Sequence, residues 1–152
     1  MYVLIISIIA IILDRVTKLL ATSLGLNNSV TVINNFFNIT YVNNYGAAWS
    51  MLTGYRILLI IISILILIGI YFMFIRNKKL NKFESINYGL LTGGIIGNLL
   101  DRIIYGYVID FLDFNIIGYN YPIFNLADSF IVISIILIIF NEFKGDKSAS
   151  RK

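Results

Sequence analysis

The sequence predicts a membrane-embedded, all-α fold of four transmembrane helices, with a small extracytoplasmic β-hairpin inserted after the first helix. Three observations support this fold class. The 152 residues are 59% hydrophobic and only 13% charged, whereas soluble domains carry about 25% charged residues. Four long apolar segments approach the roughly 20 residues that cross a bilayer. Lys and Arg residues are concentrated in the middle loop and the C-terminal tail and are absent from the other two connections between these segments. The length fits a single domain, residues 1–152.

We expect the four helices at about residues 2–24, 57–75, 85–104 and 124–143. A chain segment in lipid must satisfy its backbone hydrogen bonds internally, which a helix does. The second segment is uncharged, whereas charges interrupt the first at Asp14, Arg15 and Lys18. In that first segment the charges follow the apolar run instead of preceding it, unlike a cleaved signal peptide. We therefore interpret it as a permanent helix.

The positions of Lys and Arg predict the orientation of the chain. The loop 76–82 and the tail with Lys144, Lys147, Arg151 and Lys152 are basic. The connection 19–55 has no charged residue, and the connection 103–127 has only Asp110 and Asp113. Because basic connections stay in the cytoplasm, both termini and the middle loop are expected there, with the other two connections outside.

The first outer connection contains a hairpin pattern within about residues 28–52. Two β-prone runs, 30–33 and 36–42, flank an Asn34-Asn35 turn. Such a hairpin could rest on the membrane surface or cover a site, and the pattern alone leaves both open. We interpret the second outer connection as a loop and Asp113 as a solvated loop acid.

The absence of two residue types limits the chemistry. The chain has no Cys and no His, which excludes disulfides, thiolate nucleophiles, Ser-His catalysis and HExxH zinc sites. No cofactor or metal is expected. The net charge of +4 lies mostly beside apolar spans, so we interpret it as membrane topology and expect no nucleic-acid partner.

The acidic residues converge on one level near the outer surface. At about 1.5 Å per residue along a helix, Asp14 and Asp101 fall in the outer half of the membrane. Asp128 lies one turn into the fourth helix, and Asp110 lies just beyond the third. Acids at such depths are costly and are often functional.

Structural explanations account for several of these polar residues. Asp14 with Lys18, and Asp101 with Arg102, are expected to form ion pairs, Arg102 holding its neighbour ionised. The row Gly89, Gly93 and Gly97 is expected to serve close helix packing and not phosphate binding.

Asp110 and Asp128 have no basic residue nearby in sequence. Two facing carboxyl groups that share one proton can activate water and polarise a carbonyl, as in aspartic proteases. This pair predicts peptide-bond hydrolysis.

Three other functions remain open from the residues alone. Intramembrane acids also occur in ion-coupled transporters, although here they all lie in one half of the membrane. The hairpin could serve a non-enzymatic assembly or chaperone subunit. Asp110, Asp113 and Asp128 could hold a divalent ion, although no calcium-loop spacing supports this.

Five sequence blocks, in order, resemble lipoprotein signal peptidase, the type II signal peptidase of bacteria. They are Asp14-Arg15-Val16-Thr17-Lys18, the run 44–50 (Asn-Tyr-Gly-Ala-Ala-Trp-Ser), the run 93–102 (Gly-Gly-Ile-Ile-Gly-Asn-Leu-Leu-Asp-Arg), Val108-Ile109-Asp110-Phe111, and Phe124-Asn125-Leu126-Ala127-Asp128-Ser129. The resemblance covers nearly the whole chain. Where the family usually has Gln after its first aspartate, this chain has Arg15.

The resemblance implies an aspartyl endopeptidase that removes signal peptides from diacylglyceryl-modified prolipoproteins. Cleavage would fall just before the lipidated cysteine, at the outer face of the bacterial cytoplasmic membrane. The family's catalytic aspartates fall on Asp110 and Asp128. Its supporting and substrate-binding positions fall on Asp14, Lys18, Asn44, Gly46, Asn98, Asp101, Arg102 and Asn125. The implied partners are lipid-modified prolipoprotein signal peptides and membrane lipid, with the enzyme acting as a monomer. Asn44 is expected to hydrogen-bond the substrate backbone.

Overall fold

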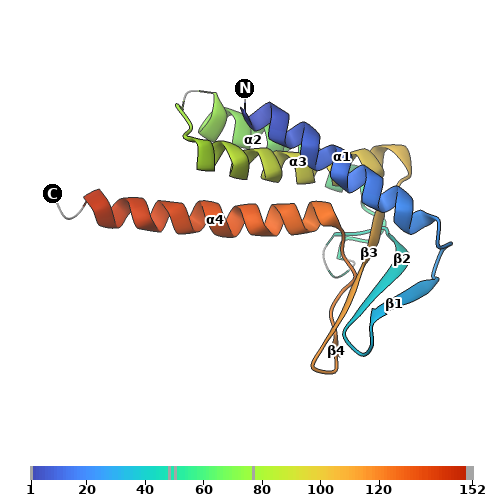
Figure 1. The fold of residues 1–152 in the computed structure, drawn as a ribbon. Coiled ribbons are helices and arrows are strands. Elements are labelled where there is room, and N and C mark those ends of the chain that lie inside the picture. The colour runs from blue at the N-terminus through green and yellow to red at the C-terminus, as the bar shows by residue number, and fades with distance from the viewer. Residues whose placement is uncertain (1, 48, 50, 77, 150–152) are drawn as a thin grey trace.

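Figure 1 shows the computed structural model of the chain, which describes residues 2–47, 49, 51–76 and 78–149. Side chains are described as far as Asn141. Some residues of the predicted outer region, middle loop and basic tail therefore lie outside the described side chains, namely Ala48, Ser50, Asn77, Lys144, Lys147, Arg151 and Lys152.

The described residues form four α-helices, which lie along one another with a small sheet at one end (Figure 1). The helices are α1 (Tyr2–Thr22), α2 (Arg56–Ile70), α3 (Lys82–Ile104) and α4 (Leu126–Ala149), and α2 continues into the π-helix η2 (Tyr71–Ile75). The N-terminus of α3 is closed by a capping box, in which Asn81 accepts from the Glu84 backbone N–H and the Glu84 side chain accepts from Asn81 N–H.

Glycines allow α1 and α4 to pack closely against α3. A Cβ added to Gly93 would lie 2.7 Å from the Cβ of Ala10, and one on Gly97 would lie 2.6 Å from Asp14 Oδ2. On the side toward α4, a Cβ on Gly94 would lie 2.6 Å from the Ala127 carbonyl oxygen. These separations are too short for any side chain, so the predicted packing role of the glycine row is confirmed.

Among the described helices, only Arg56–Ile75 is both long and apolar enough to span a membrane by composition, while the apolar stretch Leu126–Asn141 is shorter. The helices α1 and α3 contain charged and amide side chains that are buried between helices, such as Asp14, Lys18 and Asn98. Whether α1 and α3 can face lipid therefore depends on the exposed face of each helix and not on its average composition. The outer face of α1 is apolar, with Ile5, Ile12 and Leu20 exposed.

The sheet has four antiparallel strands in the order β1-β2-β3-β4. They are β1 (Ser29–Ile33), β2 (Phe37–Asn44), β3 (Val108–Ile116) and β4 (Tyr119–Asn120). The β1–β2 hairpin confirms the small sheet expected after the first helix. The expectation of a loop over 103–127 is wrong, because β3 pairs with β2 along nearly its whole length, from Phe37 opposite Phe114 to Asn44 opposite Val108.

Asp113 is also not a loop acid. It lies on β3, is only partly exposed, and accepts a 2.7 Å hydrogen bond from Thr40 Oγ1 on the neighbouring strand. A strand turns successive side chains to opposite faces. Asp113 and Asp110, three residues apart on this strand, therefore face opposite sides of the sheet.

Candidate active site

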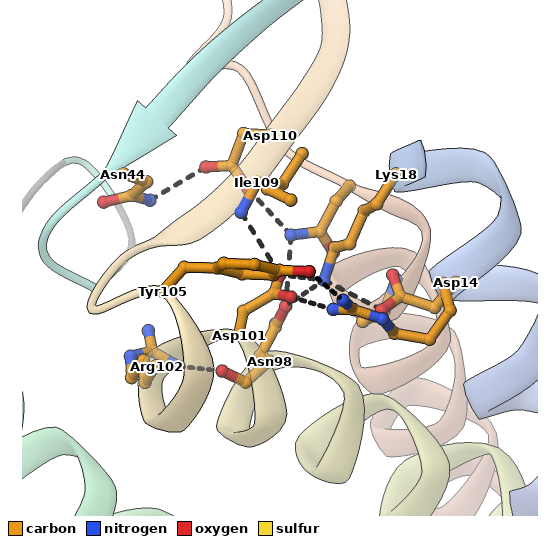
Figure 2. A network of polar contacts seen from close by, with 12 residues as sticks. Asp14, Lys18, Asn44, Asn98, Asp101, Arg102, Tyr105, Ile109 and Asp110 are labelled. Atoms are coloured by element: carbon orange, nitrogen blue, oxygen red, sulfur yellow. Dashed lines mark hydrogen bonds and ion pairs between the residues drawn. The ribbon is translucent and has the colours of Figure 1, made fainter. Parts of the chain in front are cut away.

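Asp110 lies on β3 where this strand passes the ends of the helices, and its side chain is buried, with 1% of the residue exposed. Each carboxylate oxygen accepts a hydrogen bond from an asparagine. Asn44 Nδ2 donates to Oδ2 at 2.9 Å, and Asn125 Nδ2 donates to Oδ1 at 2.7 Å. Figure 2 shows Asn44 reaching Asp110 from the neighbouring strand. The β2–β3 pairing thus places Asp110 and holds its carboxylate.

Asn44 is itself fixed by its own turn. Its side-chain Oδ1 accepts from the backbone N–H of Gly46 at 2.9 Å, the two-residue spacing of an Asx turn. The amide nitrogen is thereby left to face Asp110. The carboxamide holds the acid directly, a contact that the sequence blocks did not reveal.

Asp128 lies in the first turn of α4, where it forms a reciprocal cap with Asn125. The Asp128 N–H donates to Asn125 Oδ1 at 2.9 Å, and Asn125 N–H donates to Asp128 Oδ2 at 3.2 Å. The other carboxylate oxygen, Oδ1, accepts from Asn98 Nδ2 at 2.7 Å. This N-x-x-D spacing is an asparagine version of the capping box, and it orients Asp128 through the start of the helix.

Two buried carboxamides connect the two acids. Asn125, with 0% of the residue exposed, donates both to Asp110 and, at 3.1 Å, to Asn98 Oδ1. Asn98 in turn donates to Asp128. A carboxamide can donate and accept at once, so Asn98 and Asn125 link the carboxyl groups of β3 and α4 into one hydrogen-bonded network.

A buried ion cluster lies next to this network. Lys18, fully buried, lies 2.8 Å from Asp14 Oδ2 and 2.8 Å from Asp101 Oδ2, and it donates to Asn98 Oδ1 at 2.9 Å. Figure 2 shows Lys18 between the two acids. The expected Asp14–Lys18 pair is present, and through Asn98 the cluster contacts the network of Asp110 and Asp128.

The expected pairing of Asp101 with Arg102 is wrong. Asp101 is instead paired with Arg15 and Lys18 of α1, because successive residues of a helix point in different directions. Arg15 also donates to the Tyr105 hydroxyl at 3.0 Å. The sequence identified Arg15 as a charge within the first apolar segment and as a departure from the family pattern, but no local spacing connects it to a residue 86 positions away.

Arg102 has a different role in the fold. Its guanidinium donates to the Gly46 carbonyl at 2.9 Å and to the Asn98 carbonyl at 3.3 Å. It thereby fastens the turn after β2 to α3, next to Asn44. Asp14 makes a similar connection to α4, since its Oδ1 accepts from the Ala127 N–H at 3.0 Å.

The electrostatics favour a proton on the acid pair. Burial, followed by the charge of Asp128, raises the pKa of Asp110 to about 7, against the opposing hydrogen bonds from Asn44 and Asn125. Within the described part of the chain, no group of three His, Cys, Asp or Glu side chains is arranged to hold a metal ion. The site therefore offers two carboxyl groups, amide donors and a nearby buried cation.

Comparison with known proteins identifies the family. The model of the signal peptidase II family matches residues 6–144. The chain belongs to the signal peptidase II family. Two lipoprotein signal peptidases of Staphylococcus aureus, from strains JH9 and Newman, are each 43% identical to it over 148 residues, covering 97% of this chain and 91% of theirs.

Two solved structures share the fold of this signal peptidase. Both are described as bacterial membrane enzymes. One, at 2.3 Å resolution, superposes with a TM-score of 0.88 and 41% identity, covering 96% of this chain and 90% of that one. The other, at 1.9 Å, gives a TM-score of 0.83 and 43% identity, covering 93% and 92%. This signal peptidase is accordingly a protease of the aspartic type with a membrane-enzyme fold that carries a small antiparallel sheet.

Proposed function

We propose that this enzyme removes signal peptides from diacylglyceryl-modified prolipoproteins, cutting before the lipidated cysteine with Asp110, Asp128 and one water molecule. The observation that carries the proposal is the hydrogen-bonded link between the two acids. Asn125 contacts both carboxyl-bearing residues, and Asn98 contacts Asp128 and Asn125. The relatives that are 43% identical to this chain are named lipoprotein signal peptidases, and this name supports the choice of substrate.

The chemistry needs one proton shared between the two carboxyl groups. The ionised member takes a proton from water, whose oxygen attacks the scissile carbonyl carbon, while the neutral member gives its proton to the carbonyl oxygen. Proton transfer to the departing nitrogen then breaks the C–N bond. The products are a signal peptide with a free carboxyl group and a cysteine with a free amine.

The surrounding residues are proposed to position this pair. Asn44 and Asn125 hold Asp110, and Asn98 holds Asp128. Arg102 and Gly46 keep the turn after β2 near the site, and Asp14, Lys18 and Asp101 fix α1 against α3 and α4. Such preorganisation leaves little reorganisation for the transition state. Because Asn44 already donates to Asp110, its expected contact with the substrate backbone would require this hydrogen bond to be shared or exchanged.

The proposed topology places the site at the outer surface of the bacterial cytoplasmic membrane. Four spans with both termini in the cytoplasm agree with the positive-inside pattern of Lys and Arg. We propose that residues 1–152 form a single domain. Lys18, Asp101 and Asp128 lie near the same end of α1, α3 and α4, the end that carries the sheet (Figure 1). A lipidated cysteine held at the bilayer surface would then be delivered at the depth of the acids. We propose that a monomer suffices, since the acids and their partners come from one chain.

The test uses purified enzyme with two synthetic precursors that differ only in the cysteine, one carrying diacylglyceryl and one unmodified. The proposal expects mass spectrometry to find a single cut before the modified cysteine, no cut in the unmodified peptide, and an unchanged rate in chelator. Cleavage at other positions, or equal cleavage of both peptides, would contradict it. An ion-coupled transporter or assembly subunit would leave both peptides intact.

A further inference from the structure

Arg15 lies at the edge of the buried ion cluster, at a position where the family usually has Gln. The cluster contains two carboxylates, Asp14 and Asp101, and the ammonium group of Lys18, and all three residues are completely buried. Two carboxylates and one ammonium leave an excess negative charge, which is costly in a buried place. The guanidinium of Arg15 pairs with Asp101 Oδ1, and 21% of the Arg15 side chain is exposed. Arg15 therefore balances the charge of the cluster from its outer side.

Asp101 connects this cluster to the backbone of β3. Its Oδ2 accepts a 3.2 Å hydrogen bond from the backbone N–H of Ile109, the residue immediately before Asp110. Figure 2 shows Asp101 facing both Lys18 and Ile109. A carboxylate that two cations hold from different sides has little freedom to turn. The pairing of Asp101 with Arg15 and Lys18 thus fixes the oxygen that holds the start of β3.

A row of aromatic rings makes a second connection from Arg15. The guanidinium donates to the Tyr105 hydroxyl at 3.0 Å, and its Cζ lies 5.4 Å from the centroid of that ring, within the range of a cation–π contact. The ring of Tyr105 is stacked on that of Tyr107, with centroids 6.0 Å apart, and the centroids of Tyr107 and Tyr45 are 5.4 Å apart. Tyr45 directly follows Asn44 in the chain. The row therefore ends at the turn that carries one of the two amide donors to the acid of β3.

We propose that Arg15 is a positioning residue for Asp110, acting through Asp101 on β3 and through the tyrosine row on the turn after β2. This inference rests on the proposed function, because its effect on turnover is measured with that reaction. A guanidinium presents five donors in a planar fork, so Arg15 binds Asp101 and Tyr105 at once. The amide of a glutamine has two donors, a shorter side chain and no charge. Arginine at position 15 thus ties α1 to both strands of the site by contacts that glutamine does not reproduce.

The test compares Arg15→Gln and Arg15→Lys with a matched control. Glutamine is the residue that the family usually has at this position, so the variant is expected to fold, and lysine keeps the charge that pairs with Asp101. Arg76→Gln is the control, because the Arg76 Cζ also lies over an aromatic ring, 5.2 Å from the centroid of Phe72, but at the end of the bundle opposite the sheet (Figure 1). The rate constants kcat and KM are measured for each purified protein with a lipidated precursor, well below its melting temperature.

The proposal expects Arg15→Gln to lower kcat about 2- to 10-fold with little change in KM, because a small displacement of a catalytic group slows the chemical step and a partly exposed ion pair is a weak constraint. Arg15→Lys should recover most of the loss, and Arg76→Gln should behave as wild type. Wild-type kcat in Arg15→Gln would overturn the inference, and so would equal losses in the glutamine and lysine variants. A higher KM at constant kcat would also overturn it and would indicate that Arg15 contacts the precursor.

Hydrogen–deuterium exchange tests the same contact without any substrate. The Ile109 amide should exchange faster in Arg15→Gln than in wild type, because the Asp101 oxygen that protects it is held less firmly. The amides of β1 should exchange at the wild-type rate in both proteins. Equal exchange of the Ile109 amide in wild type and Arg15→Gln would overturn the inference. A wild-type protein that cleaves no precursor, combined with faster exchange at Ile109 in the variant, would instead contradict the proposed function and support the contact.

Discussion

Replacement of Asn125 by alanine tests how the acid pair is held. The side chain is completely buried and makes three contacts: it donates to Asp110 Oδ1 at 2.7 Å and to Asn98 Oδ1 at 3.1 Å, and it accepts from Asp128 N–H at 2.9 Å. Asn125→Ala removes all three at once. No other described contact joins Asp110 to the residues that hold Asp128.

The size of the effect follows from the type of hydrogen bond. A hydrogen bond to a charged group contributes about 1.5–3 kcal/mol, and about 1.4 kcal/mol corresponds to a tenfold change in rate. If the Asp110 contact is needed in the transition state, kcat should fall about 10- to 100-fold. Because the Asn125 hydrogen bond lowers the pKa of Asp110, its loss should also move the alkaline limit of activity to higher pH.

The assay measures kcat, KM and their pH dependence for the purified variant with a lipidated precursor. Asn120→Ala is the matched control, because Asn120 is an exposed asparagine on β4 whose side chain contacts Asn115, away from both acids. The control should behave as wild type. Wild-type kcat in Asn125→Ala, or a lower kcat in both variants, would refute the reasoning.

Four further predictions concern packing, charge, and the pH dependence of activity and of stability. Gly93→Ala should lower the free energy of unfolding by about 1–3 kcal/mol, because its Cβ would lie 2.7 Å from a side-chain carbon of α1. Gly69→Ala is the control and should not destabilise the protein, because its Cβ would have nothing within 4 Å. Equal melting temperatures of the two variants in detergent would contradict this prediction. Arg15→Gln should lower the melting temperature by removing the partly buried partner of Asp101, and no change would show that the contact contributes nothing. The ratio kcat/KM should fall about tenfold per pH unit above about pH 7. The reason is that the pKa of Asp110 is raised to about 7, so the acid pair loses its shared proton above this pH. A kcat/KM that stays constant up to about pH 9 would contradict this prediction. The same raised pKa means that between 3.8, its ordinary value, and about 7 the folded protein holds a proton that the unfolded chain has lost. Stability should therefore decrease as the pH rises through that window and level off above it.

The sequence predicted features that depend on local pattern. The β1–β2 hairpin follows from β-prone runs around Asn34-Asn35, and the glycine row follows from the spacing of Gly93 and its neighbours. The missed features depend on residues far apart in the chain. β3 was not predicted because its pairing with β2 joins segments about 70 residues apart, and because its acids interrupt the apolar alternation that marks a strand.

The same distinction between local pattern and contacts of distant residues applies to the candidate site. The positions of Asp110 beyond the third helix and of Asp128 near the start of the fourth could be predicted from the sequence, whereas their depth in the membrane stays a prediction. Their connection through Asn125 could not, because it depends on how β3 packs against α4. The pairing of Asp101 with Arg15 was predicted wrongly as a pairing with Arg102, since adjacency in sequence does not place two side chains on one face of a helix.

The central claim is that Asp110 and Asp128 act as one catalytic pair. The most direct measurement is cleavage of the lipidated precursor by Asp110→Asn and Asp128→Asn, with Asp113→Asn as the control acid on the opposite face of β3. The account predicts that each of the first two variants loses about 10²- to 10⁴-fold in kcat while still binding the precursor, and that Asp113→Asn cleaves like wild type. Cleavage at the wild-type rate by either Asp110→Asn or Asp128→Asn would contradict the account.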